Sequence, residues 1–460
     1  MSHLRPSHWT VWAAALAVIA LGAPGAAQPA LPMSEAEADA PALPEILDSR
    51  ERAEIIDRLL AERLDTLMPR LMREEGIDLW LLMSREYFEE PALATMLDAQ
   101  SFHARRRTIL IFHDPGNGAP IERLTVSRYG LADLFEPAWD PDEEPHQWQA
   151  VADLVAERDP QTIAVNVSDA TRFGDGMTKS QYDAMIAALP QHLQNRVISG
   201  EQLAVRWLET RIPAEMQMYP GIVRIAHAII GEAFSRAVIT PGITTAADVQ
   251  WWYRDRLLGL GLEPWFHPSV GIQREGAEGI LRGDEVIQPG DLLWTDFGIT
   301  YLRLNTDTQH LAYVLKPGEL EAPAGLAQGL ANSNRVQDIL REEMKTGLSG
   351  NQILANARSR ATAEGLNPSI YSHPIGYHGH GAGTAIGFWD NQDADSRGED
   401  ILRPDTAWSI ELTTYAAIPE WGGQRVDFRT EEDAYFDGET VRFLDGRQTE
   451  ITLIPSDDPR

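Results

Sequence analysis

Four acidic residues in the C-terminal half of the chain have a spacing that could serve one chemical task. Asp296 and Asp307 lie in one stretch that reads as two strands joined by a turn, and Glu411 and Glu431 lie in a second such stretch. Taken alone, each would be interpreted as a solvated strand residue. Asp296 and Glu411, however, stand within apolar runs, where an unpaired ionised group is costly. Four carboxylates brought together need a compensating charge, which two divalent metal ions would supply.

Strand register predicts that each acidic pair projects from one face of its sheet. An odd number of positions separates the two aspartates, so one continuous strand would point them to opposite faces. A hairpin that turns between Tyr301 and Leu302 instead places them opposite each other. The same construction centred on Trp421 pairs the two glutamates. Because like charges directly opposite each other destabilise a sheet, both hairpins favour a bound cation.

The segment between the two hairpins offers imidazole ligands. It reads His373-Pro-Ile-Gly-Tyr-His378-Gly-His380-Gly-Ala-Gly383, and a neutral imidazole would complete a metal site without changing the charge balance. The chain contains no cysteine, which excludes disulfides, thiolate zinc sites, iron–sulfur clusters and thiol nucleophiles. Any metal must therefore be held by His, Asp and Glu.

Length and charge limit the kinds of protein that this chain could be. Its 460 residues predict two domains, and 43% hydrophobic with 23% charged residues is typical of a globular protein. The 69 acidic residues outnumber the 39 basic ones, for a net charge of -30. Such a field repels phosphate backbones, so we expect no nucleic-acid partner.

The elements that must position the acidic residues occur in a repeated order. Each acidic hairpin is preceded by two stretches with helical periodicity. The first unit comprises helices over 214–238 and 245–260, with Thr244 or Thr245 as the cap of the second, and a strand pair over 292–315. The second unit comprises helices over 324–344 and 351–365 and a strand pair over 407–436. The unit of two helices and a hairpin is thus predicted twice.

The N-terminal part of the chain predicts an export signal followed by an α/β domain. Arg5, an apolar run over 9–21 and the small residues up to Ala27 are typical of a cleavable signal peptide over 1–27. That run is too short to span a bilayer, so we expect a periplasmic or secreted protein without a membrane partner. A linker over 28–44 then precedes a domain over 45–204.

Helical and apolar patterns alternate in the predicted domain over 45–204. Helical periodicity covers 46–76 and 149–157, and short apolar runs of buried-strand length cover 77–83, 108–113 and 162–167. Helices that alternate with buried strands favour an α/β domain.

The metal-ligand candidates resemble those of a known enzyme family. Asp296-Phe-Gly with an Asp eleven positions on, Gly-His380-Gly-Ala-Gly, Ile-Glu411 and Arg429-Thr-Glu431 are similar, in order and spacing, to the five ligand motifs of the pita-bread dinuclear metallopeptidases. The resemblance covers about 205–455. The extra N-terminal domain is similar to the proline-specific branch, aminopeptidase P and prolidase. The implied fold is an α+β pita-bread (creatinase/aminopeptidase) C-terminal domain over 205–455, preceded by a smaller α/β N-terminal domain.

The resemblance also implies a role for each ligand. Asp296 and Asp307 would share one metal, Asp307, His380 and Glu411 would hold the other, and Glu431 would bridge them. Oxygen-rich ligation with one imidazole favours manganese, with cobalt or zinc as alternatives. The two metals would hold a bridging hydroxide, and Glu411 would act as general base and then general acid.

Residues around the metals are predicted with less support from the motifs. Arg429, two positions before a ligand, is expected to contact a metal-binding carboxylate. His378 and His373 are expected to face the substrate, although either could be a hydrogen-bonded core histidine, and the choice between His378 and His380 as ligand stays open.

Three positions depart from the family pattern. The usual His before the first metal Asp is replaced near Arg282, and the His-acid pair that normally follows the metal His by seven positions reads Trp389-Asp390. The usual Thr-Arg after the second Asp reads Gln-His310. We expect these changes to alter the surroundings of the substrate while leaving the metal ligands intact.

The sequence therefore predicts an exported metal-dependent peptidase that hydrolyses Xaa-Pro bonds at the N-terminus of peptides, as an aminopeptidase or a dipeptidase. Two alternatives stay open: a creatinase-like hydrolase of non-peptide C–N bonds, and a metal-loaded binding protein without turnover. Family members often pair, so a homodimer is also an open expectation. Substrate length and the native metal are not determined by the sequence.

Overall fold

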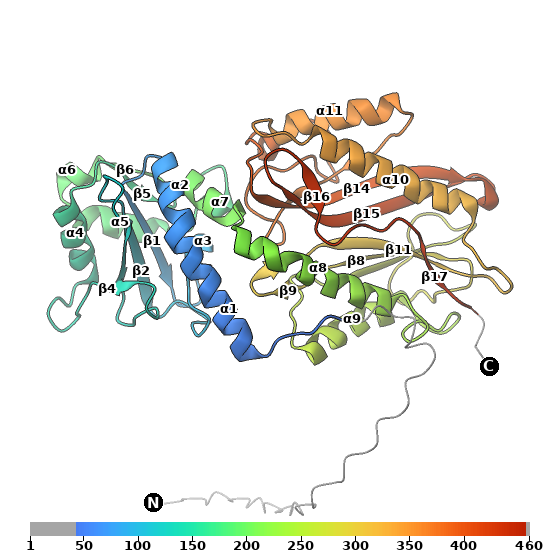
Figure 1. The fold of residues 1–460 in the computed structure, drawn as a ribbon, viewed down its shortest axis with the longest axis horizontal. Coiled ribbons are helices and arrows are strands. Elements are labelled where there is room, and N and C mark those ends of the chain that lie inside the picture. Colours follow the sequence, from blue (N-terminus) through green and yellow to red (C-terminus); the bar gives the residue numbers. More distant parts are fainter. Residues whose placement is uncertain (1–42, 457–460) are drawn as a thin grey trace, which may run out of the picture. The chain divides into compact units, whose positions relative to one another are not determined.

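The computed structural model of the protein describes residues 43–456, and within them it contains two separate large sheets (Figure 1). The predicted signal peptide and nearly all of the predicted linker lie outside the described residues. Among the residues that are described, no helix combines the length and the apolar character needed to cross a membrane.

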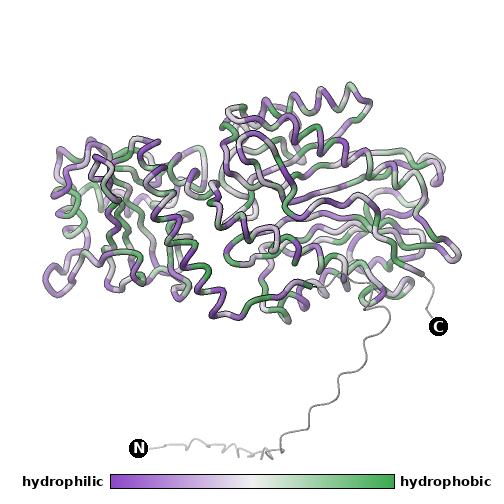
Figure 2. Tube along the Cα trace, viewed as in Figure 1, coloured by the Kyte–Doolittle hydropathy of each residue, from purple (hydrophilic) through white to green (hydrophobic). Residues whose placement is uncertain are grey.

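The first sheet has six strands in the order β4-β3-β2-β1-β5-β6. Its strands are β1 Leu79–Arg85, β2 Arg107–His113, β3 Glu122–Val126, β4 Glu136–Pro137, β5 Ile163–Val165 and β6 Val197–Ser199. The central strand β1 pairs antiparallel with β2 and parallel with β5, and it is buried over all but its last residue. This explains why its sequence is an apolar run without alternation, visible as hydrophobic colouring in Figure 2. The predicted strands over 77–83, 108–113 and 162–167 are confirmed within two residues.

Helices surround this sheet, and one of them departs from the predicted pattern. They are α1 Ser49–Glu62, α2 Met68–Glu74, α3 Pro91–Ala94, α4 Gln147–Arg158, α5 Lys179–Ala188, α6 Gln191–Gln194 and α7 Glu201–Glu209, with a short 3-10 turn η3 Arg172–Gly174. The predicted helix over 46–76 is interrupted by a π-helical turn, η2 Arg63–Leu67. Arg63 on this turn is fully buried, and its Nη1 atom donates to the Thr210 carbonyl and to Glu215.

The second sheet has nine strands, with β12-β14-β15-β11-β8-β7 as its main path. The strands of this region are β7 Ser269–Gln273, β8 Leu292–Phe297, β9 Thr300–Tyr301, β10 Leu304–Asn305, β11 Thr308–Val314, β12 Ser369–Ile370, β13 His373–Ile375, β14 Thr406–Ile418, β15 Gln424–Phe436, β16 Val441–Phe443 and β17 Thr452–Ile454. β9 and β10 form a separate small ribbon, and the neighbouring strands β8, β11, β14 and β15 of the main path run antiparallel. The predicted strand pairs over 292–315 and 407–436 are therefore confirmed.

Four long helices complete this part of the chain. They are α8 Pro213–Ala233, α9 Ala246–Leu260, α10 Ala324–Glu343 and α11 Gly350–Ala363, and two 3-10 turns, η4 Ser396–Gly398 and η5 Pro419–Trp421, accompany them. The predicted order of two helices and a hairpin, occurring twice, is confirmed. Thr245 caps α9 by accepting from the backbone N–H of Asp248, which settles the predicted choice between Thr244 and Thr245.

These helices pack against one face of the sheet. Alternate residues of β14, among them Trp408, Ile410 and Leu412, share an apolar core with α10 and α11, while α8 and α9 share a core with β8 and β11. Because successive side chains of a strand point to opposite faces, Glu411 is directed away from these helices. The helices thus leave the acidic face of the sheet free for chemistry.

The two acidic hairpins differ in how well their register was predicted. Glu411 lies opposite Glu431, as predicted from a turn centred on Trp421. Asp296, in contrast, lies opposite Gln309 rather than Asp307, so the predicted register of the first hairpin is wrong by two residues. A shift by two keeps every side chain on its predicted face, and the two aspartates still meet.

The cause of this shift is a tight turn placed one residue later than predicted. Leu302 and Arg303 both have positive φ, at 53° and 65°, as expected for the two central residues of a type I′ turn. Arg303 donates hydrogen bonds to the carbonyls of Leu97 and Asp98 in the first sheet's domain. A contact distant in sequence therefore accompanies a turn that local composition does not indicate.

Candidate metal centre

The four predicted acidic ligands converge on one small volume. Asp307 and Glu431 are 4% and 1% exposed, and the carboxylates of Asp296 and Asp307 line the same cavity and repel each other. The Gln309 amide donates to Glu411 Oε1 at 2.7 Å and to Glu431 Oε2 at 2.5 Å. One amide nitrogen thus touches carboxylates from both strands of the second hairpin, which places all four acids within a single cluster.

Burial leaves this cluster short of positive charge. Desolvation raises the pKa of Asp296 to about 7 and, together with the neighbouring Asp296, raises that of Glu411 to about 8. The pKa values of Asp307 and Glu431 lie well above their usual range for the same reason, with further contributions from the adjacent carboxylates. Buried carboxylates that repel one another in this way are stabilised by protons or by cations.

His373 presents a free nitrogen to this cluster. Strand β13 pairs with β14 so that His373 lies opposite Ser409, whose hydroxyl hydrogen-bonds Glu431. Its Nδ1–H donates to the Pro374 carbonyl at 3.0 Å, while its Nε2 lies 3.8 Å from both Asp307 Oδ2 and Glu431 Oε1. Burial and the nearby His380 lower the pKa of His373 to about 3, so the ring is neutral.

The unpaired atoms of the cluster test whether metal ions would fit. Within residues 43–456, neither His373 Nε2 nor Asp307 Oδ1 has a hydrogen-bond partner, although both are buried. A neutral imidazole with its lone pair directed at carboxylates is a metal-ligand arrangement, and its Nδ1–H bond to a carbonyl is the usual way in which such a ring is oriented. The donor set of four carboxylates and one imidazole therefore fits divalent ions.

The other two histidines lie further from the acids. His380 borders the cavity next to the acids, with its ring 4.8 Å from that of His373 and 5.2 Å from that of Trp265. Among the described residues, Asp307, His373 and Glu431 form a group that could hold a metal ion, and His380 is not part of it. His378 packs 4.9 Å from Phe173 of η3, which directs it toward the first sheet's domain.

A spacing already present in the sequence points to the same assignment. His380 follows His373 by seven positions, the interval that the resemblance implies between the metal His and a second His. The Gly-His-x-x-Gly match drew the prediction to His380 instead. The glycine at position 379 is explained by packing rather than by metal binding, because a Cβ atom there would lie 2.4 Å from the ring of Trp265.

Two arginines stack on one indole beside the acids. The guanidinium of Arg429 lies 5.0 Å from the centre of the Trp294 ring, and that of Arg282 lies 5.1 Å from it. Both charges act to lower the pKa of Asp296 against the effect of burial. Arg429 thus acts electrostatically on the acidic cluster, and its expected contact with a ligand carboxylate stays a prediction.

The acids open into a cavity of about 430 Å³. Aromatic side chains form much of its wall, namely Trp265, Phe266, Trp294, Tyr371, Trp389 and Tyr415. Trp389 is 77% exposed and stands at the solvent side.

His310, which the sequence placed near the substrate, is hydrogen-bonded to Glu432 instead. It follows Gln309 on β11, so the alternation of a strand turns it to the helix-covered face. That expectation was wrong.

A curled antiparallel sheet covered by helices, with a buried carboxylate and imidazole cluster on its open face, defines a metal-dependent hydrolase of the pita-bread fold. Residues 221–433 match the model of metallopeptidase family M24, so this part of the chain is an M24 domain and the protein is a hydrolase.

Solved structures share this fold over nearly their whole length. An X-Pro aminopeptidase from Thermotoga maritima is 17% identical, with a TM-score of 0.59, and the match covers 84% of this chain and 99% of that one. A Xaa-Pro dipeptidase from Bacillus anthracis is 18% identical, with a TM-score of 0.55 and coverage of 88% and 100%. The prolidase from Pyrococcus horikoshii is 14% identical, with a TM-score of 0.54 and coverage of 87% and 99%. No curated protein matches the chain.

Proposed function

We propose that this protein hydrolyses the bond between an N-terminal residue and a following proline, using two divalent metal ions. The observation that carries the proposal is the buried cluster of four carboxylates and one neutral imidazole, open to an aromatic cavity. Two of the structures named above, an X-Pro aminopeptidase and a Xaa-Pro dipeptidase, support the specificity.

The ligands would be the four acids and His373. Asp296, Asp307, Glu411 and Glu431 supply oxygen donors, and the unpaired Nε2 of His373 faces two of them. We propose His373 in place of His380 because only the former belongs to a group with ligand spacing. The oxygen-rich set favours manganese, with cobalt or zinc as alternatives. When bound, such ions lower the pKa of a water molecule and polarise the carbonyl that it attacks.

Glu411 is the proposed proton carrier. It borders the cavity, and the Gln309 amide holds its Oε1 atom. Its second oxygen accepts no side-chain hydrogen bond within the described residues, so it can take a proton from water and return it to the departing nitrogen. In the ion-free chain, burial and the neighbouring Asp296 raise the pKa of this carboxylate to about 8.

The cavity wall supplies what a proline substrate needs. A Xaa-Pro bond has no N–H to donate, so recognition must come from contact with the ring and from the free amino terminus. Trp265 and Phe266, with ring centres 4.4 Å apart, offer an apolar surface for the proline ring. Burial and Arg172 lower the pKa of His380, which keeps the imidazole neutral and able to donate one hydrogen bond to the substrate.

Export is part of the proposal and rests on the sequence alone. The apolar run over 9–21 and the small residues before position 28 support a signal peptide and a periplasmic or secreted location. Sequencing the N-terminus of protein recovered from the periplasm or medium tests it, and an intact Met1 on protein confined to the cytoplasm would refute it.

The test of the activity is a peptide panel measured with metal content. Chelator-treated protein is loaded with manganese, cobalt or zinc and incubated with Xaa-Pro dipeptides, longer Xaa-Pro-led peptides and matched Xaa-Ala peptides. We expect release only from the proline peptides, with two ions bound per chain after loading with manganese. Release from dipeptides alone identifies a dipeptidase. Loaded protein that leaves every peptide intact contradicts the proposal and favours a binding protein or a creatinase-like hydrolase.

A further inference from the structure

We propose that His227, His310 and Glu432 form a third metal site, mononuclear and suited to Zn²⁺, on the helix-covered face of the sheet. It lies behind the carboxylate cluster, since Glu432 follows Glu431 on β15 and His310 follows Gln309 on β11, whose amide hydrogen-bonds two of the acids. Nothing in the peptidase proposal requires this site.

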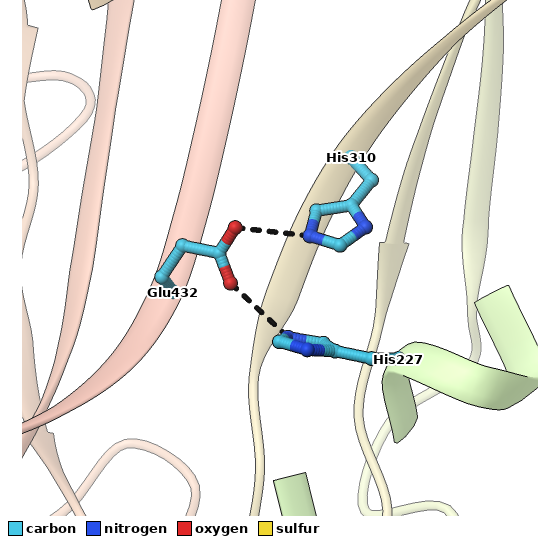
Figure 3. Close-up of side chains that lie close together, drawn as sticks. All are labelled: His227, His310 and Glu432. Atoms are coloured by element: carbon cyan, nitrogen blue, oxygen red, sulfur yellow. Dashed lines mark hydrogen bonds and ion pairs between the residues drawn. The ribbon is translucent and has the colours of Figure 1, made fainter. Parts of the chain in front are cut away.

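The three side chains converge from separate elements (Figure 3). His310 Nε2 on β11 lies 2.9 Å from Glu432 Oε1 on β15, and His227 Nε2 on α8 lies 3.1 Å from Glu432 Oε2. The three potential ligand atoms all lie within 4.8 Å of one another. Two imidazoles and a carboxylate with an open position are a common zinc ligand set.

Further hydrogen-bond partners orient two of the potential ligands, His227 and Glu432. Asp445 Oδ2 lies 3.2 Å from His227 Nδ1, so Nδ1–H can donate to it while Nε2 faces Glu432. Arg224 in turn pairs with Asp445 at 2.7 Å. Glu432 Oε1 accepts the backbone N–H of Gln448 at 2.7 Å. A carboxylate that orients the far nitrogen of an imidazole is the arrangement found behind metal-bound histidines.

Charge and access also suit a divalent cation. Glu432 and Asp445 carry two negative charges, and the Arg224 partner of Asp445 is 60% exposed, where solvent screens it. The imidazoles are 15% and 14% exposed while Glu432 is 2% exposed. The carboxylate is therefore buried, yet water and ions can reach the histidines. Nitrogen-rich donors favour zinc over the metals that prefer oxygen ligands.

A proton competes for the same position. Burial opposes it, but hydrogen bonds to Asp445 and Glu432 raise the pKa of His227 to about 10, so an ion-free cluster holds a proton between His227 and Glu432. A metal ion would displace that proton. The experiment must therefore count ions directly rather than rely on stability or activity.

The test counts zinc in the full chain. Chelator-treated wild type, His227→Gln and His310→Gln are dialysed against one zinc buffer and analysed by mass spectrometry of the metal. We expect each variant to hold one zinc ion per chain fewer than the wild type. His113→Gln is the matched control, because His113 pairs with Glu122 at 2.7 Å and is 12% exposed but belongs to no candidate metal group among the described residues. It should hold as much zinc as the wild type.

A second variant removes the carboxylate centre from the count. A chain with Asp307→Asn and His373→Gln should still take up one Co²⁺ ion, detected by its visible absorption, and adding His310→Gln should abolish that absorption. Asp445→Asn should weaken the affinity about tenfold or more while retaining the site. Equal zinc content in the wild type and both histidine variants, or no cobalt signal without the carboxylate centre, overturns the proposal and leaves a proton-linked ion-pair network.

Discussion

The two faces of the strand pair β11 and β15 carry clusters that solve the same electrostatic problem differently. On the open face, Glu431 meets other carboxylates and the neutral His373. On the helix-covered face, the adjacent Glu432 meets His227 and His310. Burial raises the pKa of Glu431 well above its usual range. Burial also acts to raise the pKa of Glu432, but His310 and His227 together lower it to about 2.

The difference shows what a buried carboxylate requires. Glu431 and Glu432 are neighbours in one strand and are both almost fully buried, so burial alone does not distinguish them. The side chains that each glutamate meets on its own face of the sheet distinguish them. A cluster whose charges are balanced by its own side chains is stable without help, whereas one made mainly of acids must bind protons or metal ions.

The largest expected effect comes from Glu411→Gln on the open face. The amide keeps the volume but cannot carry a proton, so kcat for Xaa-Pro hydrolysis should fall by about 10²- to 10⁴-fold. Steady-state kinetics and circular dichroism on metal-loaded protein check this. Glu439→Gln, at an exposed turn, is the control and should leave kcat unchanged. Undiminished turnover in the Glu411 variant would remove this residue from the proposed chemistry.

Metal removal should make stability depend on pH through the same face. The folded ion-free chain holds protons on Asp296 and Glu411 up to about pH 7 and 8, whereas ordinary values are 3.8 and 4.5. Their contribution to stability is fully present below about pH 4 and is lost as the pH rises through 8. Metal-loaded protein should not show this loss of stability.

The thermal midpoints of chelated and manganese-loaded protein, followed from about pH 5 to 9, measure the effect. We expect the difference in midpoint between the two forms to widen as the pH rises. The corresponding difference in the free energy of unfolding should reach the order of a few kcal/mol. Asp296→Asn should flatten the curve of the chelated protein. A gap that stays constant or narrows would show that the acids are not the source.

The comparison of His373→Gln with His380→Gln tests the choice of ligand. Loss of the imidazole that faces Asp307 and Glu431 should weaken metal binding about tenfold or more. Loss of His380, which borders the cavity, should leave metal content unchanged and reduce turnover. Isothermal titration with manganese and peptide kinetics separate the two. The reverse pattern would return the ligand role to His380.

The smallest expected effect concerns the mouth of the cavity. Trp389→Ala removes an exposed ring at the solvent side, so we expect KM to rise a few-fold, by about 1 kcal/mol of lost contact, with kcat little changed. Trp251→Ala is the matched control, since Trp251 is also exposed and lies outside the cavity wall. Equal KM values for the two variants would show that Trp389 makes no substrate contact.

Local patterns predicted the elements well because apolar periodicity records burial directly. Helices α8 to α11 and the long hairpin of Glu411 and Glu431 followed from it, since the Pro-Glu-Trp-Gly-Gly turn marks its own centre. The hairpin of Asp296 has no such mark, as Leu302 and Arg303 are not typical turn residues. The π turn at Arg63 was likewise hidden, because its buried guanidinium is satisfied by residues about 150 positions away.

By itself, the sequence determined which residue types were available and on which face of each strand they lie. It also determined that the four acids require a cation, and that, without cysteine, only His, Asp and Glu can hold a metal. Only the tertiary structure decided which histidine meets them and where His310 belongs. Side-chain alternation is a property of one strand, whereas the distance from an imidazole to a carboxylate depends on how β13, β14 and β15 pair. Sheet pairing joins residues far apart in the chain, and local composition does not encode it.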